Sequence, residues 1–177
     1  ADWYDYEPTA EQKKNGIHVE SHFGTMIFGE GSRFISQETE APDYIYAEHG
    51  SVIFRGGQIY NMAADGTASD LPKYLVIGGD KFEADDDDTE FPHKGYPDYP
   101  QVAFEAGDYA FDNVYVGVDE DNKAVTGTLT LNGSNLNLAN GLTVTGFGTA
   151  EIAKGTLTAG GISVGGGNLN VTGGTIN

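Results

Sequence analysis

The chain has 177 residues, of which 27 are acidic and 9 are basic, and its formal net charge is -18. A chain this acidic repels nucleic acid and anionic membrane surfaces, so we expect neither as a partner. It has no cysteine, which excludes disulfides and thiolate metal sites, and no run of about 18 apolar residues that would span a membrane.

The first residues combine aromatic and acidic side chains, in the order ADWYDYEP. Trp3, Tyr4 and Tyr6 are typical of a segment that docks onto a neighbouring protein, where aromatic side chains are enriched. Packing of the same side chains onto their own domain is an equal alternative. Residues 9–15 are a helix candidate, and they are short and weakly patterned.

Alternating apolar and polar residues then predict strands along the front part of the chain. The segments are residues 17–23, 44–47, 74–77, 101–104 and 113–118, together with two related phrases, GTMIFGEGSRFI at 24–35 and GSVIFRGGQIYN at 50–61. Trp3 and all 10 tyrosines lie in this front part, which favours a compact core there.

An acidic segment at residues 84–100, ADDDDTEFPHKGYPDYP, interrupts these strands, and its prolines indicate a loop. Asp85, Asp86, Asp87 and Asp88 are candidate Ca²⁺ ligands, because Ca²⁺ takes six to eight oxygens. Adjacent carboxylates of an extended chain point alternately apart, however, so a solvated acidic loop is the competing interpretation.

A second acidic group follows at residues 119–122, DEDN. Asp119, Asp121 and Asn122 resemble a fragment of a Ca²⁺ loop, but the glycine and the distal glutamate of such a loop are missing. A turn between two strands is the competing interpretation. The four histidines, at positions 18, 22, 49 and 93, are expected to be packing or surface residues, because positions 18 and 22 are about 13 Å apart on a strand.

The frequency of charged residues falls abruptly after Lys123. Residues 124–177 contain only Glu151 and Lys154 as charged residues, so this segment is neutral. The shift predicts a boundary between an acidic, aromatic-rich domain at residues 1–123 and a second unit at residues 124–177.

The neutral segment repeats one phrase, a glycine followed by alternating small polar and apolar residues, as in GTLTLNGSNLNL. It starts at Gly127, Gly141, Gly155 and Gly166, which gives an expected period of 11–14 residues. The period-two alternation predicts short strands with one aliphatic face, and the glycines suit tight turns. We therefore expect an all-β protein, with an irregular β-rich front followed by a β-solenoid or an intertwined trimeric β-shaft.

Self-association is expected because 54 residues with slim aliphatic side chains form a marginal core alone. Three sister chains that share an apolar seam would complete the core and cover strand edges, so we expect a homotrimer.

Catalytic motifs are missing from the sequence: it has no nucleophile elbow, phosphate loop or zinc signature. In the repeats only Glu151 carries a carboxylate, so no acidic pair suited to glycoside hydrolysis is expected there. The Thr-x-Thr pairs at 128/130, 143/145 and 156/158 are unequally spaced, which argues for a hydrated outer face over an ice-binding ladder.

The repeats TGTLTLNGSNLNLANGLTVTG and GGNLNVTGGTIN resemble the strand-turn repeats of bacteriophage fibre and spike proteins, over residues 124–177. The resemblance implies a non-enzymatic virion protein (a head or tail fibre, or a capsid decoration protein) without a cofactor. Its front part would attach to capsid or tail proteins, and its trimeric shaft would serve adhesion to a host surface glycan. Two alternatives remain: a bacterial secreted adhesin or extracellular filament subunit, and a polysaccharide-binding or polysaccharide-cleaving module.

Overall fold

The computed structural model describes residues 17–37, 43–62, 67, 73–79, 100–119 and 123–177, and the regular structure within them is β-strand. The expected all-β class is therefore confirmed. The helix candidate at 9–15 lies outside the described residues, as does nearly all of the acidic segment at 84–100. The strands are β1 (Ile17–Gly29), β2 (Arg33–Gln37), β3 (Asp43–Arg55), β4 (Gln58–Met62), β5 (Lys73–Ile77), β6 (Gln101–Ala106), β7 (Asp108–Val116), β8 (Thr126–Thr145), β9 (Phe147–Ala159), β10 (Ile162–Gly165), β11 (Asn168–Val171) and β12 (Thr175–Ile176).

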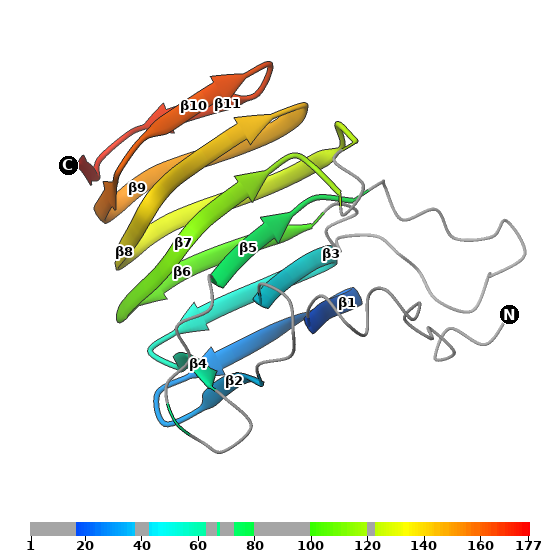
Figure 1. Ribbon diagram of the computed structural model, residues 1–177, viewed down its shortest axis with the longest axis vertical. Coiled ribbons are helices and arrows are strands. Elements are labelled where there is room, and N and C mark those ends of the chain that lie inside the picture. Colours follow the sequence, from blue (N-terminus) through cyan, green and yellow to red (C-terminus); the bar gives the residue numbers. More distant parts are fainter. Residues whose placement is uncertain (1–16, 38–42, 63–66, 68–72, 80–99, 120–122) are drawn as a thin grey trace, which may run out of the picture.

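The strands pair in parallel, and ten of them form one sheet with the central order β1-β3-β5-β7-β8-β9-β11. The remaining two, β2 and β4, pair with each other in a small second sheet. Figure 1 shows the strands stacked along the long axis of the molecule, with β1 at one end and β10 and β11 at the other. Chain order and spatial order therefore coincide along the stack.

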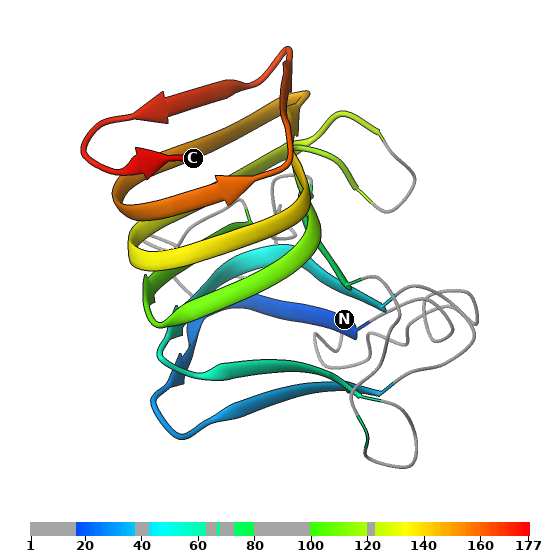
Figure 2. The same ribbon diagram turned by 60° about the vertical axis from the view of Figure 1, so that its left-hand side comes forward.

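In the neutral segment, three short strand segments follow one another before the chain returns to pair with the first, and we call each such set a rung. Residues 126–131 pair with 147–152, residues 134–138 with 155–159, and residues 142–145 with 162–165. Residues 168–171 and 175–176 then lie on the two segments of β9. Figure 2 shows the ribbon curving from each segment into the next.

The pairing corrects the expected period of 11–14 residues. Thr126 pairs with Phe147, 21 positions later, and Thr149 pairs with Asn168, 19 positions later. The repeated phrase contains two strand segments, whereas three segments complete a rung, so the phrase is shorter than the structural repeat. The same register explains why the Thr-x-Thr pairs are unequally spaced. Thr128 lies on the first segment of a rung, Thr143 lies on the third, and Thr156 pairs with Asn135 on the second.

Parallel pairing stacks inward side chains of the same kind into continuous columns, because each strand keeps one face toward the core. One column passes through the middle of the stack from Ile45 to Leu142, and its members are at most 2% exposed. Four such columns are Ile45–Leu75–Val114–Leu142–Ile162, Ala47–Ile77–Val116–Val144–Val164, Phe28–Phe54–Phe104–Leu131–Ile152–Val171 and Tyr109–Leu136–Leu157–Ile176.

Two of the columns, those that begin at Phe28 and at Tyr109, change in composition along the stack, from aromatic to aliphatic. The rings of Phe28, Phe54 and Phe104 stack with centroids 5.3 and 5.1 Å apart, and Tyr109 packs against Phe104 at 4.8 Å. Beyond β8 the same columns contain only Leu, Ile, Val and Ala.

Most aliphatic side chains of the neutral segment are covered without sister chains, in contrast to the expectation that three chains share an apolar seam. Leu129, Leu131, Leu136 and Leu157 are buried within a single chain, so they need no sister chains to cover them. Within residues 124–177, the column members that stay partly or largely uncovered are the last ones, in β10 to β12. The homotrimer itself stays a prediction.

The shift in charge at Lys123 does not interrupt the sheet or the core. β6 and β7 on one side of this position pair with β8 on the other, and one cluster of buried side chains contains residues of both parts. The division into domains at residues 1–123 and 124–177 stays a prediction.

Close stacking of the turns requires glycine at some corners. Gly117 has a φ of 90°, and a Cβ at this position would overlap the carbonyl oxygen of Thr145 in the following rung. Its own N–H donates to the carbonyl of Ile77 at 2.8 Å. Gly117 therefore lies between two backbones in a corner that has no room for a side chain.

Candidate functional site

The predicted partner-binding residues and most of the predicted calcium ligands lie outside the described residues. This applies to Trp3, Tyr4 and Tyr6, to Asp85–Asp88 and to Asp121. Their roles stay predictions. Within the part of the chain that the structure describes, no group of three or more His, Asp or Glu side chains is placed to hold a metal ion.

Asp119 is the one calcium candidate whose place is described, and it closes a turn. Its Oδ1 accepts a hydrogen bond from the backbone N–H of Lys123 at 2.8 Å, and its own N–H donates to the carbonyl of Lys123 at 3.1 Å. Val118 and Ala124 pair as an antiparallel bridge on either side. These contacts agree with the turn interpretation at Asp119 and at Lys123, the residue that follows the DEDN segment.

Of the histidines, His49 is the one whose surroundings are described. It lies in β3, and its Nε2 is 3.8 Å from a carboxylate oxygen of Glu48. His18 and His22 lie in β1, as their strand assignment predicted, and His93 lies outside the described residues.

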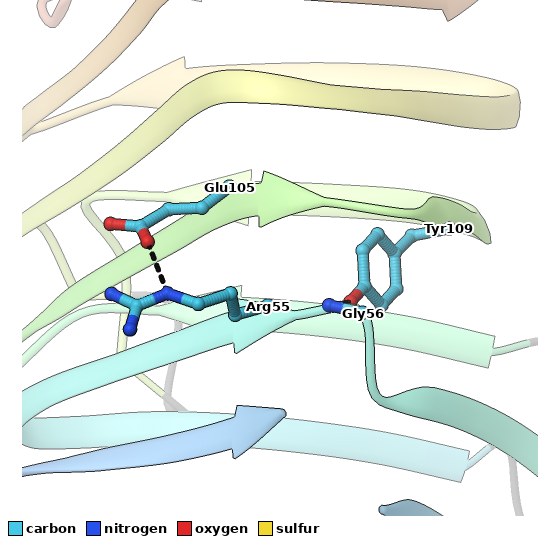
Figure 3. A network of polar contacts seen from close by, with 4 residues as sticks. All are labelled: Arg55, Gly56, Glu105 and Tyr109. Atoms are coloured by element: carbon cyan, nitrogen blue, oxygen red, sulfur yellow. Dashed lines mark hydrogen bonds and ion pairs between the residues drawn. The ribbon is translucent and has the colours of Figure 1, made fainter. Parts of the chain in front are cut away.

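A polar network links two rungs at the end of β3, and no sequence pattern predicts it. Arg55 Nε donates to Glu105 Oε2 at 2.7 Å, and the backbone N–H of Gly56 donates to the hydroxyl oxygen of Tyr109 at 3.1 Å (Figure 3). Arg55 and Glu105 are 50 positions apart, so only the pairing of β3 with β6 brings them together. Arg55 is about half exposed, and an ion pair of this kind contributes roughly 0.2–1 kcal/mol. The network therefore links two neighbouring rungs at this corner.

Lys73 is a partly buried basic residue at the start of β5. Burial lowers the pKa of its ammonium, and the nearby Asp112 carboxylate acts in the opposite direction. The Lys73 Nζ lies 5.4 Å from the centre of the Phe111 ring, while Asp112 accepts a hydrogen bond from the Lys73 backbone N–H at 2.9 Å. These contacts hold β5 against β7, which is a structural role.

The outward face of the rungs is built from amide and hydroxyl side chains in register. One outward column contains Gln101, Thr128, Thr149 and Asn168, and another places Glu151 between Thr130 and Asn170. Along its column, Glu151 therefore has no second carboxylate beside it. Cross-rung hydrogen bonds, such as Asn135 Nδ2 to Asp108 Oδ1 at 2.7 Å, satisfy part of this face.

The end of the stack formed by β10, β11 and β12 exposes apolar side chains, and we call it the C-terminal end. Ile162, Val164 and Val171 are 38%, 46% and 51% exposed, although each continues a buried column. These residues lie on the apolar face that the alternation predicts, and no other described strand lies over them. These exposed apolar side chains make this end the candidate functional surface.

Comparison with protein-family models, curated proteins and solved structures gave no match. Among the described residues there is no helix of the length and apolarity that a membrane crossing requires.

Proposed function

We propose that the protein is a non-enzymatic structural protein of a phage virion: a head or tail fibre, or a capsid decoration protein. In this proposal residues 124–177 form a β-solenoid shaft, and the acidic front part attaches the shaft to the particle. Trp3, Tyr4 and Tyr6 would provide the aromatic contacts with a capsid or tail protein.

The observation that carries the proposal is the continuity of the apolar columns through successive rungs. Each rung pairs through backbone hydrogen bonds with the one before it, and the side chains of the inward columns fill the interior of the stack. Stability in such a stack comes from neighbouring repeats. The result is a rigid body extended along the stacking direction, as an adhesive shaft requires.

The outward face fits the same role. It presents uncharged Thr and Asn side chains in register, which suit hydrogen bonding to water, to neighbouring chains or to a host surface glycan. Lateral association into a homotrimer would use these outward columns, since the inward ones are enclosed by each chain.

A second candidate is a bacterial secreted β-solenoid adhesin or extracellular filament subunit. One observation favours it: the core from β3 to β9 is complete within a single chain, so a shaft of this kind needs no sister chains to fold.

The two candidates differ in where the protein is found. We expect immunogold electron microscopy, with an antibody against the purified chain, to label phage particles released from the source cells. Labelling of the cell envelope together with unlabelled particles would contradict the virion proposal and favour the adhesin.

A further inference from the structure

Two strands of the front part do not join the main sheet. β3 pairs directly with β6 over residues 51–55, so the layers that contain these strands are neighbours. β4 follows β3 in the chain and β7 follows β6, yet among the described strands β4 pairs only with β2. β2 and β4 therefore form a small sheet of their own, which we call the flap, and Figure 1 shows them side by side near the β1 end of the molecule.

Polar contacts at one corner hold the flap against the neighbouring layer. The backbone N–H of Gly56 donates to the carbonyl of Ala106 at 2.9 Å and to the hydroxyl oxygen of Tyr109 at 3.1 Å. Beside them, Arg55 Nε donates to Glu105 Oε2 (Figure 3). We call these three contacts the clasp. None of the hydrogen bonds described for β2 and β4 reaches β7, so within the described residues the clasp is the polar link between the two layers.

The apolar side chains of the flap are less buried than those of the layer beside it. Phe34 and Ile59 pack against the core but stay partly exposed, whereas Tyr109 and Phe111 are 4% and 3% exposed. The Phe34 ring meets the Phe28 ring edge to face, with centroids 5.5 Å apart. Because stabilisation grows with the apolar area removed from water, the flap is held less firmly than the strands of the neighbouring layer.

Glycines lie where the chain enters each strand of the flap. Gly31 precedes β2 and Gly56 precedes β4, and both have a φ of 86°. A Cβ placed at Gly31 would meet no atom within 4 Å, so there is open space beside this corner. Glycine tolerates a wide range of backbone angles, so both corners are suited to act as hinges.

We propose that the flap is a conformational device that opens as a unit at the Gly31 and Gly56 corners, while β3 and β5 to β9 stay paired. The clasp sets how often it opens, and opening uncovers the aromatic rings of Phe28 and Tyr109. Once lifted from the core, a two-stranded sheet is marginally stable by itself, so the amides of the flap lose their protection from exchange. The inference does not depend on the virion role.

Amide hydrogen exchange of the full chain in low concentrations of urea tests the proposal. Amides of β2 and β4 should exchange on the order of 100-fold faster than those of β8 and β9, through an opening that exposes less surface and therefore depends less steeply on urea. Ile152→Val weakens the core at β9, which does not pair with the flap, and should speed exchange in β8 and β9 about fivefold. Exchange of the flap should stay within about twofold in this variant.

Two further variants test the clasp. Tyr109→Phe removes one acceptor of the Gly56 N–H and keeps the ring, and we expect the flap amides to exchange about fivefold faster, the net effect of one hydrogen bond. The matched control is Tyr60→Phe, which removes a hydroxyl whose partner, Gln58, lies on the flap itself, and it should change exchange by less than about twofold.

Two outcomes would overturn the proposal. Equal acceleration of the flap and β9 amides in Ile152→Val would show that the flap opens only when the whole protein unfolds. Equal effects of Tyr109→Phe and Tyr60→Phe would show that the clasp does not control the opening.

Discussion

Replacement of Phe104 by alanine tests whether the aromatic column is the centre of the core. The Phe104 ring is fully buried and packs against three other rings: Phe54 at 5.1 Å, Tyr109 at 4.8 Å and Phe111 at 6.2 Å between centroids. Truncation of a buried phenylalanine costs about 3–5 kcal/mol of unfolding free energy, because the lost contacts leave a cavity. We expect about 4 kcal/mol for Phe104→Ala. For Phe104→Leu, which keeps most of the volume but loses the ring pairs, we expect about 1–2 kcal/mol.

Urea unfolding followed by far-ultraviolet circular dichroism measures this effect. With a denaturant slope of about 2 kcal/mol per molar urea, a loss of 4 kcal/mol lowers the midpoint by about 2 M. The control is Phe147→Ala, since Phe147 is the same residue type but is 72% exposed, and it should change stability by less than about 0.5 kcal/mol. Similar midpoints for the Phe104 and Phe147 variants would refute the column as described.

Three further predictions concern single positions. Gly117→Ala should lower the free energy of unfolding by more than about 3 kcal/mol, because the positive φ is strained and the Cβ also overlaps a neighbouring backbone. Gly31→Ala, at a φ of 86° with open space around it, should lower it by only about 1–2 kcal/mol. Equal losses for the two variants would contradict the crowded corner at Gly117. The Ser134 hydroxyl is buried without a hydrogen-bond partner among the described residues, so Ser134→Ala should raise stability by about 1 kcal/mol in thermal unfolding. A loss of stability of that size would show that the hydroxyl forms a hydrogen bond. Burial raises the pKa of Tyr109, so the unfolded chain releases the phenol proton at a lower pH than the folded chain does. Stability should therefore fall as the pH rises above about 10. Urea titrations at about pH 9 and pH 11 should show that Tyr109→Phe removes this part of the loss.

Strand formation could be predicted from the sequence because period-two alternation reports a local property of the chain. Leu129, Leu131, Leu136 and Leu138 alternate with Thr and Asn, and each is buried as the pattern indicated. The front strands were found for the same reason. The part of β7 around Tyr109 was missed, because its acidic residues and Gly107 resemble a loop.

Pairing could not be predicted, because it depends on residues far apart in the sequence. Thr128 pairs with Gln101 and Thr149, and no local pattern distinguishes these partners from the other polar positions of the repeats. The corner contact between Arg55 and Glu105 depends on this register. The exposure of Val164 was also invisible in the sequence, since Val164 has the same pattern as Val144, which is buried.

The nearly constant spacing between paired residues in the last rungs has a consequence for the length of the molecule. Each rung contacts chiefly the rung before it, about 20 residues earlier in the chain. A duplication or deletion of one such block would lengthen or shorten the body by a single layer, about 4.8 Å, and leave every other layer with its original neighbours. The length of the molecule could thus change in evolution by unequal recombination, one layer at a time, while the buried side chains of the other layers stay the same.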